Sequence, residues 1–231
     1  SVYDYLPYSM FYSDMNAKGY CVEPDFTKPQ RNIHELLKKS LKINHSSEES
    51  IQYVYFTEPD AVMHEYGAYS REAKEICQAL DKEVEAYANA LSEDTLLIIT
   101  ADHGHTNVHP IHLFACSPIL SLLEREPAND ARCITFKVKP HKKEEFEVLF
   151  HQLFSSVYKL YKTEEAIRLG FFGLSSDKAN PRCKDFLADY VAVGIHEYYF
   201  NYKSKDDFVF KSHHAGITKE EMLVPVCIVR R

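Results

Sequence analysis

An apolar run that ends in Asp-His-Gly is the feature of this sequence that most constrains its fold. Residues 96–100, Leu-Leu-Ile-Ile-Thr, are followed by Ala101, Asp102, His103 and Gly104. A short apolar run bounded by a turn signal is typical of a strand buried on both faces, as in a parallel sheet. In open α/β sheets, ligands bind at the carboxyl ends of the strands. We therefore expect Asp102 and His103, which are good ligands for Zn²⁺ and related ions, to lie at a binding site.

A strand and a helix precede this run. Residues 51–57, Ile-Gln-Tyr-Val-Tyr-Phe-Thr, have the composition of a strand, which ends before Pro59 because proline cannot donate to a sheet ladder. Residues 73–91 carry apolar side chains at helical spacing, which predicts an amphipathic helix. The strand–helix–strand order favours a right-handed crossover and a parallel pairing of residues 51–57 with residues 96–100.

That pairing would gather four metal-ligating side chains at one edge of the sheet. Asp60 and His64 follow the first strand and, four positions apart on a helical turn, share one face. Asp102 and His103 follow the second strand. Because the carboxyl ends of parallel strands meet at one edge, we expect these side chains to lie within reach of a common metal site.

The remaining pattern divides the chain into a core and an insert. Residues 1–125 and 212–231 form the expected α/β core, and residues 126–211 form an α+β insert whose aromatic residues are expected mostly to pack against one another. The other elements expected are an irregular Tyr-rich stretch at 1–30, helices at 31–41, 143–160 and 164–169, and strands at 133–138, 189–193, 198–200 and 223–229.

Composition narrows the classes of function. The 231 residues are 45% hydrophobic and 26% charged, as in a folded protein, and the net charge of −7 makes nucleic acid an unexpected partner. No apolar run reaches the ~18 residues of a membrane span and no signal-peptide pattern is present, so no membrane association is expected. The six cysteines form no CxxC pair and are read as reduced, which favours a cytoplasmic setting.

Three motifs occur in a fixed order along the chain. They are Thr57-Glu58-Pro59-Asp60-Ala61-Val62-Met63-His64-Glu65-Tyr66-Gly67, then Thr100-Ala101-Asp102-His103-Gly104, then His214-Ala215-Gly216-Ile217-Thr218. Together they resemble the metal-site segments of the alkaline phosphatase superfamily, and most closely its type I phosphodiesterase / nucleotide pyrophosphatase branch. The resemblance implies a three-layer α/β/α core with a cap-like insert. It also implies a hydrolase of phosphate esters that acts on a small phosphorylated substrate, with nucleotides among the candidates.

The resemblance also assigns residues to the site. It implies that Asp60, His64 and His214 hold one Zn²⁺ and that Asp102 and His103 hold another, with Mn²⁺ or another divalent ion as an alternative. Two such ions neutralise phosphate charge and stabilise the attacking and leaving oxygens. The candidates for orienting these ligands from outside are Glu58, Tyr66, His105 and His213.

One part of the family pattern lies outside these motifs. The family has an Asp directly after its first core strand and a Thr or Ser nucleophile at a helix N-terminus, both upstream. Residues 1–50 show neither pattern, so no nucleophile is assigned and we expect the chain to be the C-terminal part of a longer enzyme. The alternatives are a metal-binding domain without catalysis and another activity of the superfamily on phosphomonoesters, phosphonates or sulfate esters.

Overall fold

The chain divides into two compact units, which are described one at a time. The first unit comprises residues 1–102 and 224–231, and the second comprises residues 103–223. The computed structural model describes residues 10–13, 18–21, 29–45, 52–172, 182, 186–202 and 208–231. None of the helices in these ranges is both long and apolar enough to cross a membrane. The predicted division at residues 125/126 and 211/212 follows different boundaries and stays a prediction.

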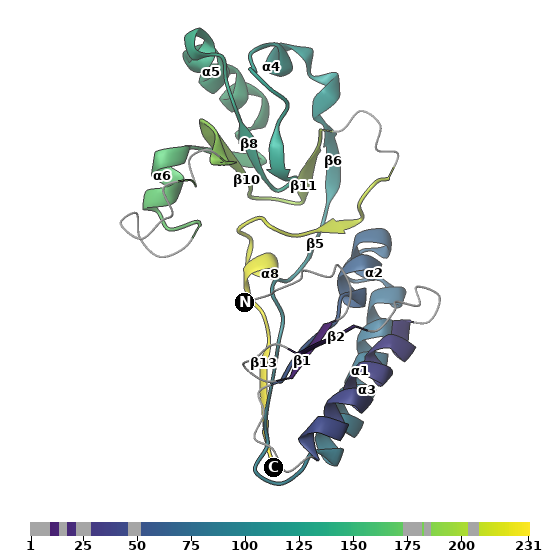
Figure 1. The fold of residues 1–231 in the computed structure, drawn as a ribbon. Helices are drawn as coiled ribbons and strands as arrows, with labels where there is room; N and C mark the ends of the chain where they lie inside the picture. The colour runs from purple at the N-terminus through teal and green to yellow at the C-terminus, as the bar shows by residue number, and fades with distance from the viewer. Residues whose placement is uncertain are drawn as a thin grey trace. The chain divides into compact units, whose positions relative to one another are not determined.

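Helices and two small sheets make up the described part of the first unit (Figure 1). Its elements are β1 (Met10–Ser13), β2 (Lys18–Cys21), α1 (Pro29–Asn44), β3 (Gln52–Tyr55), α2 (Glu58–Tyr66), α3 (Arg71–Ala90), β4 (Leu96–Thr100) and β13 (Val226–Arg230). Strand β1 pairs antiparallel with both β2 and β3, and β4 pairs antiparallel with β13. The helices expected at 31–41 and 73–91 are therefore confirmed as α1 and α3.

Helices α1 and α3 pack against each other, as Figure 1 shows. Helix α3 begins at Ser70, whose hydroxyl oxygen accepts a hydrogen bond from Ala73 N at 3.0 Å and so caps the helix. The buried residues of the helix–helix contact are Ile33, Leu37, Tyr87 and Leu91, with Val54, Phe56 and Leu97 of the strand regions packed against them. Apolar burial of this kind is the main source of stability for an amphipathic helix.

Two predictions about the strand at residues 96–100 are wrong. In the described part of the first unit, β4 pairs with β13 and β3 pairs with β1, so the parallel pairing of β3 with β4 does not form. Nor is β4 buried on both faces, because Ile98 is 58% exposed and Ile228, opposite it in the register, is 65% exposed. An apolar run predicts a strand. It does not predict which strands pair with it or what covers its second face, because distant segments of the chain supply both.

The hairpin formed by β1 and β2 is also a departure from prediction. Residues 10–13 and 18–21 are strands, although residues 1–30 were expected to be irregular; the rest of that stretch up to residue 28 lies outside the described residues. These two segments lack the alternation of apolar and polar residues by which strands are recognised. Backbone pairing with β3, which satisfies their amide and carbonyl groups, decides the structure instead.

The second unit is built around a four-stranded antiparallel sheet of strand order β7-β8-β10-β9. Its elements are β5 (Thr106–Asn107), β6 (His109–His112), η1 (Leu113–Ala115), α4 (Ser117–Ser121), β7 (Ala128–Asp130), β8 (Cys133–Phe136), η2 (Pro140–Lys142), α5 (Lys143–Phe154), β9 (Tyr158–Lys162), α6 (Thr163–Arg168), β10 (Tyr190–Gly194), β11 (Tyr198–Asn201), β12 (Ser212–His213) and α8 (Lys219–Met222). The predicted strands at 133–138, 189–193 and 198–200 and the helix at 164–169 are confirmed within one to two residues of each end.

Aromatic side chains form the core of this unit, as predicted. The buried rings are those of Phe136, Phe146, Phe150, Phe154, Tyr158 and Phe200. The predicted helix at 143–160 is wrong beyond residue 154, because residues 158–162 form strand β9, which pairs with β10. Tyr158 and Tyr161 are buried while Lys159 and Lys162 are exposed, and the Tyr158 hydroxyl donates to Ala131 O at 2.8 Å. The apolar positions in 143–160 fit a helix only as far as Phe154; beyond it the burial follows a strand.

Two short strand pairs bring distant parts of the second unit together. Strand β11 pairs in parallel with β6, and β12 pairs antiparallel with β5. In the second pair Ser212 lies opposite Asn107 and His213 opposite Thr106. This pairing places the segment that contains His214 beside the segment that contains His103 and His105.

Candidate metal centre

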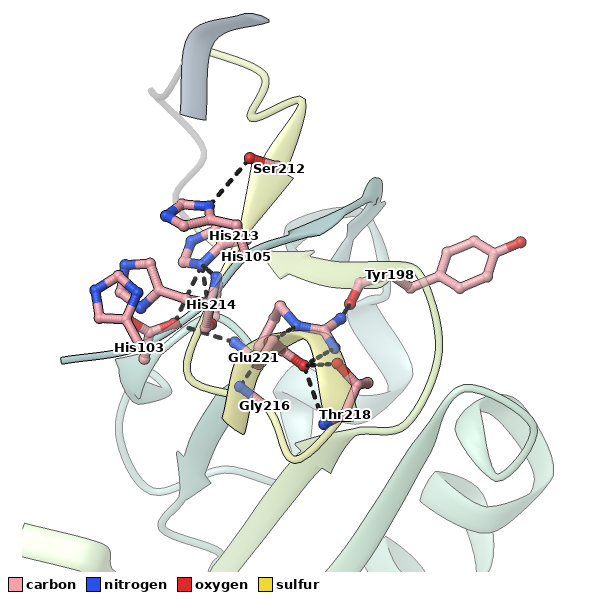
Figure 2. Close-up of polar contacts among 12 residues, drawn as sticks. His103, His105, Tyr198, Ser212, His213, His214, Gly216, Thr218 and Glu221 are labelled. Atoms are coloured by element: carbon pink, nitrogen blue, oxygen red, sulfur yellow. Dashed lines mark hydrogen bonds and ion pairs between the residues drawn. The ribbon is translucent and has the colours of Figure 1, made fainter. Parts of the chain in front are cut away.

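Three histidines of the second unit lie together at the β5–β12 pair (Figure 2). The rings of His103 and His214 are stacked, with their centroids 3.7 Å apart. The ring of His105 lies 5.4 Å from that of His103 and 5.2 Å from that of His214. One nitrogen of each ring falls within 4.8 Å of the corresponding nitrogens of the other two. We call His103, His105 and His214 the histidine cluster.

Hydrogen bonds orient two rings of the histidine cluster. His103 Nδ1 lies 3.1 Å from the carbonyl oxygen of Gly104, which can only accept, so Nδ1 carries the proton and Nε2 is the basic nitrogen. His105 Nδ1 forms a 3.1 Å hydrogen bond with the hydroxyl of Ser212. A metal-binding histidine usually has its other ring nitrogen hydrogen-bonded in this way, since the bond sets the tautomer and the ring direction. The donor set therefore fits Zn²⁺ or a similar ion, for which neutral imidazole is a good ligand.

His213 occupies a different environment from His214. It is 6% exposed, and its ring packs against those of Tyr199 and Phe210 at 5.7 and 4.7 Å between centroids. Its Nδ1 lies 3.5 Å from Asp130 Oδ1. One ligand atom from each of Asp130, His213 and His214 lies within 4.8 Å of the other two. His213 therefore lies beside the histidine cluster, with its ring packed among aromatic residues.

The residue after His214 has an unusual backbone. Ala215 has φ of 73°, in the left-handed region where the Cβ of an L-residue clashes with the following carbonyl oxygen. The turn that presents His214 therefore forms in this chain despite a local strain.

A buried ion pair supports the two segments that carry the histidine cluster. Arg132 and Glu221 are 0% and 2% exposed, and the guanidinium binds the carboxylate through two hydrogen bonds, of 2.5 Å from Nε and 2.6 Å from Nη2. Burial would raise the pKa of Glu221, but the hydrogen bonds and charge of Arg132, with hydrogen bonds from Thr218 and Gly216, hold it below its usual value.

Sequence reasoning did not identify this pair. Thr218 and Glu221 have the spacing of a capping box, a pattern that predicts reciprocal hydrogen bonds at a helix start, and this box is present in α8. That pattern could have drawn attention to Glu221. Nothing in the sequence around Arg132 connects it with a residue 89 positions later.

The other predicted ligands belong to the first unit. Asp60 and His64 lie on helix α2, and His64 Nε2 is 3.3 Å from Asp60 Oδ1, as the spacing of four residues predicts. Asp102 follows β4 and accepts a 3.1 Å hydrogen bond from the hydroxyl of Tyr55 at the end of β3. The ends of β3 and β4 therefore approach each other although the two strands are not paired.

The two orienting candidates of the first unit differ in burial. Glu58 is the buried first residue of α2, and its carboxylate lies 3.4 Å from the hydroxyl of Thr57. Tyr66 ends the same helix and is 49% exposed. A hydrogen bond to Glu65 and the charge of that carboxylate raise the pKa of Tyr66. An orienting role for Tyr66 stays a prediction.

The mixed α/β fold is the alkaline-phosphatase-like fold. A sequence model of the family "Type I phosphodiesterase / nucleotide pyrophosphatase" matches residues 10–220. The chain belongs to this family, whose members are phosphoric ester hydrolases. The predicted family and fold class are thus confirmed.

Individual relatives agree with this assignment. The mouse protein "Ectonucleotide pyrophosphatase/phosphodiesterase family member 7" is 38% identical over 65 residues, which cover 26% of this chain and 15% of that protein. The structure of an inactive murine ectonucleotide pyrophosphatase / phosphodiesterase 5 in complex with AMP matches with a TM-score of 0.62 and 18% identity, over 84% of this chain and 51% of that one. Phosphonoacetate hydrolase from Sinorhizobium meliloti, in complex with phosphonoacetate, matches with a TM-score of 0.63 and 18% identity, over 87% and 51%. The chain spans about half the length of the solved structures that it matches.

Proposed function

We propose that this chain carries the metal-binding part of a hydrolase of phosphate esters, of the phosphodiesterase / nucleotide pyrophosphatase type, with a two-zinc site. The observation that carries the proposal is the histidine cluster, because three imidazoles that each bring one ring nitrogen within 4.8 Å of the other two form a ready donor set for a divalent ion. Family membership supports the same reading, since the family matched over residues 10–220 is named for phosphodiesterase and pyrophosphatase activity.

The proposed ligand sets are those of the family resemblance. Asp60, His64 and His214 would hold one ion, and Asp102 and His103 the other. The ions, when bound, would supply positive charge that neutralises the phosphate and polarises its oxygens. His105 lies in the histidine cluster, so we propose that it contributes to the same site as a ligand or a phosphate contact. No nucleophile is assigned among the residues of this chain.

The proposed substrate is a small phosphorylated molecule. AMP bound to the murine relative and phosphonoacetate bound to the bacterial one support this class, with a nucleotide as the first candidate. A nucleic acid or a membrane surface is not proposed as a partner. The cytoplasmic setting is also kept as a proposal, to be tested by cell fractionation.

Metal content tests the ligand assignment. We expect zinc bound per chain to fall in His214→Ala and in Asp60→Ala, because each removes a donor, while an exposed histidine elsewhere, His141, serves as the control through His141→Ala. Zinc is measured by atomic emission after dialysis. Unchanged stoichiometry in both ligand variants would show that the site is misassigned.

Hydrolysis tests the activity. With added zinc, we expect the full-length protein that contains this chain to cleave bis(p-nitrophenyl) phosphate and Asp102→Ala to lower the rate roughly tenfold or more, by analogy with losses seen at metal sites. Chelation by EDTA should abolish the rate and zinc should restore it. Equal rates for Asp102→Ala and the unsubstituted protein would refute the proposal. Zinc binding without hydrolysis of any phosphate ester would favour the alternative, a metal-binding domain without catalysis.

A further inference from the structure

The buried ion pair of Arg132 and Glu221 is not explained by a contribution to folding stability. Taking two charges out of water costs several kcal/mol per ion, and replacing a buried ion pair by apolar residues of similar size is often neutral or stabilising. In this pair both side chains are inaccessible, at 0% and 1% exposure. What the pair does, beyond neutralising its own charges, is visible in the other hydrogen bonds of Glu221.

The Glu221 carboxylate accepts hydrogen bonds from the segment that follows His214. Oε1 accepts from Gly216 N at 2.8 Å, and Oε2 accepts from Thr218 N at 3.2 Å and from the Thr218 hydroxyl at 2.7 Å. Figure 2 shows Gly216 and Thr218 directed at Glu221, next to the histidine cluster. The backbone two residues beyond His214 is therefore tied to this carboxylate.

The main chain of Glu221 binds the segment that carries His103 and His105. The carbonyl oxygen of Glu221 accepts a 2.8 Å hydrogen bond from Gly104 N, and Gly104 lies between His103 and His105. Both glycines lie too close to residues 220 and 221 for a larger side chain to fit. A Cβ built on Gly216 would lie 2.5 Å from Glu221 Oε2, and one on Gly104 would clash with the carbonyl oxygen of Glu220. One residue thus holds both segments at a set distance.

Arg132 anchors this arrangement to the sheet of the second unit. It lies in the turn between β7 and β8, and its Nη1 donates to the carbonyl oxygens of His196 and Tyr198, at 2.7 and 2.5 Å, beside β11. The remaining nitrogens bind Glu221. The guanidinium therefore fixes the Glu221 carboxylate relative to the backbone beside β11.

We propose that Glu221, held by Arg132, is the positioning residue that sets the spacing of His103, His105 and His214, and with it the affinity of the histidine cluster for a divalent metal. The link to metal affinity rests on the proposed function, since it treats these histidines as zinc ligands. The link to histidine spacing does not.

Two double variants that differ at one position test the proposal on the full chain. Arg132→Met/Glu221→Gln removes both charges but keeps an oxygen that can accept from Gly216 N, whereas Arg132→Met/Glu221→Leu removes that acceptor too. Zinc affinity is measured by competition with a colorimetric chelator, and folding by circular dichroism. The exposed neighbour supplies the control variant, Glu220→Gln.

We expect the Leu variant to bind zinc on the order of 10- to 100-fold more weakly than the unsubstituted chain, as on loss of groups that orient metal ligands, with the Gln variant within a few-fold and the control unchanged. Equal affinity of a folded Leu variant and the Gln variant would overturn the proposal. If the Leu variant does not fold, Gly216→Ala decides, because its Cβ displaces the carboxylate while both charges remain. Unchanged affinity in Gly216→Ala would likewise overturn the proposal.

A second measurement separates this inference from the proposed function. The ring proton resonances of the cluster histidines are recorded by NMR without metal. If the unsubstituted chain binds no zinc, the proposed metal site fails, but shifted histidine resonances in the Leu variant, with the Gln variant unchanged, would still support positioning. Identical histidine resonances in all variants would refute it.

Discussion

Replacement of Ala215 by glycine should stabilise this protein, although glycine usually destabilises. Ala215 has φ of 73° and follows His214 directly. An L-residue in this region costs about 1–2 kcal/mol. Glycine removes that strain but frees the unfolded chain, which costs about 0.4–1 kcal/mol. The net expectation is therefore a gain of about 0.5–1 kcal/mol in the free energy of unfolding.

Thermal unfolding followed by circular dichroism measures this gain. For a chain of this length, 1 kcal/mol shifts Tm by about 2–4 °C, so Ala215→Gly should raise Tm by about 1–4 °C. Two alanines of the second unit serve as controls. Ala188 has φ of 57°, so Ala188→Gly should also stabilise. Ala192 is fully buried in strand β10, where glycine should cost roughly 0.5–1 kcal/mol through backbone entropy alone.

The comparison among the three variants can refute the reasoning. If Ala215→Gly destabilises the protein as much as Ala192→Gly does, the turn after His214 carries no strain. If Ala188→Gly stabilises and Ala215→Gly does not, the alanine side chain after His214 must make a favourable contact that outweighs the strain. Measurement in the presence of EDTA keeps bound metal from adding to the difference.

Two further predictions concern stability away from the histidine cluster. Burial would raise the pKa of Asp189, but Lys143, at 2.8 Å, and the amide of Val138, at 3.0 Å, lower it, so the folded pKa lies below the unfolded value. The stabilisation from this carboxylate is then complete above the unfolded pKa of about 3.9 and is lost as the pH falls through the folded pKa. In urea titrations Asp189→Asn should therefore be less stable than the unsubstituted chain at pH 7, with the gap closing below about pH 4; a gap independent of pH would contradict this. Ser70→Ala should lower the free energy of unfolding by about 1 kcal/mol through loss of the α3 cap, and Ser70→Asp should not; equal losses in both would contradict the capping role.

The sequence by itself determined several of the helices and the local side-chain pairs within them. Helix α3 follows from apolar spacing and the Ser70 cap, and the Asp60–His64 pair follows from a spacing of four on α2. These features depend on residues within one or two helical turns of each other, and side-chain direction along a helix is a local property. The family motifs added which of these residues to consider together.

Only the tertiary structure decided how distant segments meet. The sequence predicted neither the pairing of β4 with β13 nor the strand β9. It predicted that both faces of β4 are buried, whereas one face is exposed. Strand partners are chosen by the whole chain, because an apolar run can pair with several alternatives of equal pattern.

The site shows the same division. His103 and His214 can be picked out from their motifs, and His105 only as a candidate for orienting them. Their meeting depends on the β5–β12 pair, whose Ser212 binds His105 across 107 positions of sequence. The Arg132–Glu221 pair spans 89 positions, and the left-handed turn at Ala215 runs against the residue's own preference. Charges and strain of this kind are tolerated only where surrounding contacts over-determine the conformation, and those contacts exist only in the folded chain.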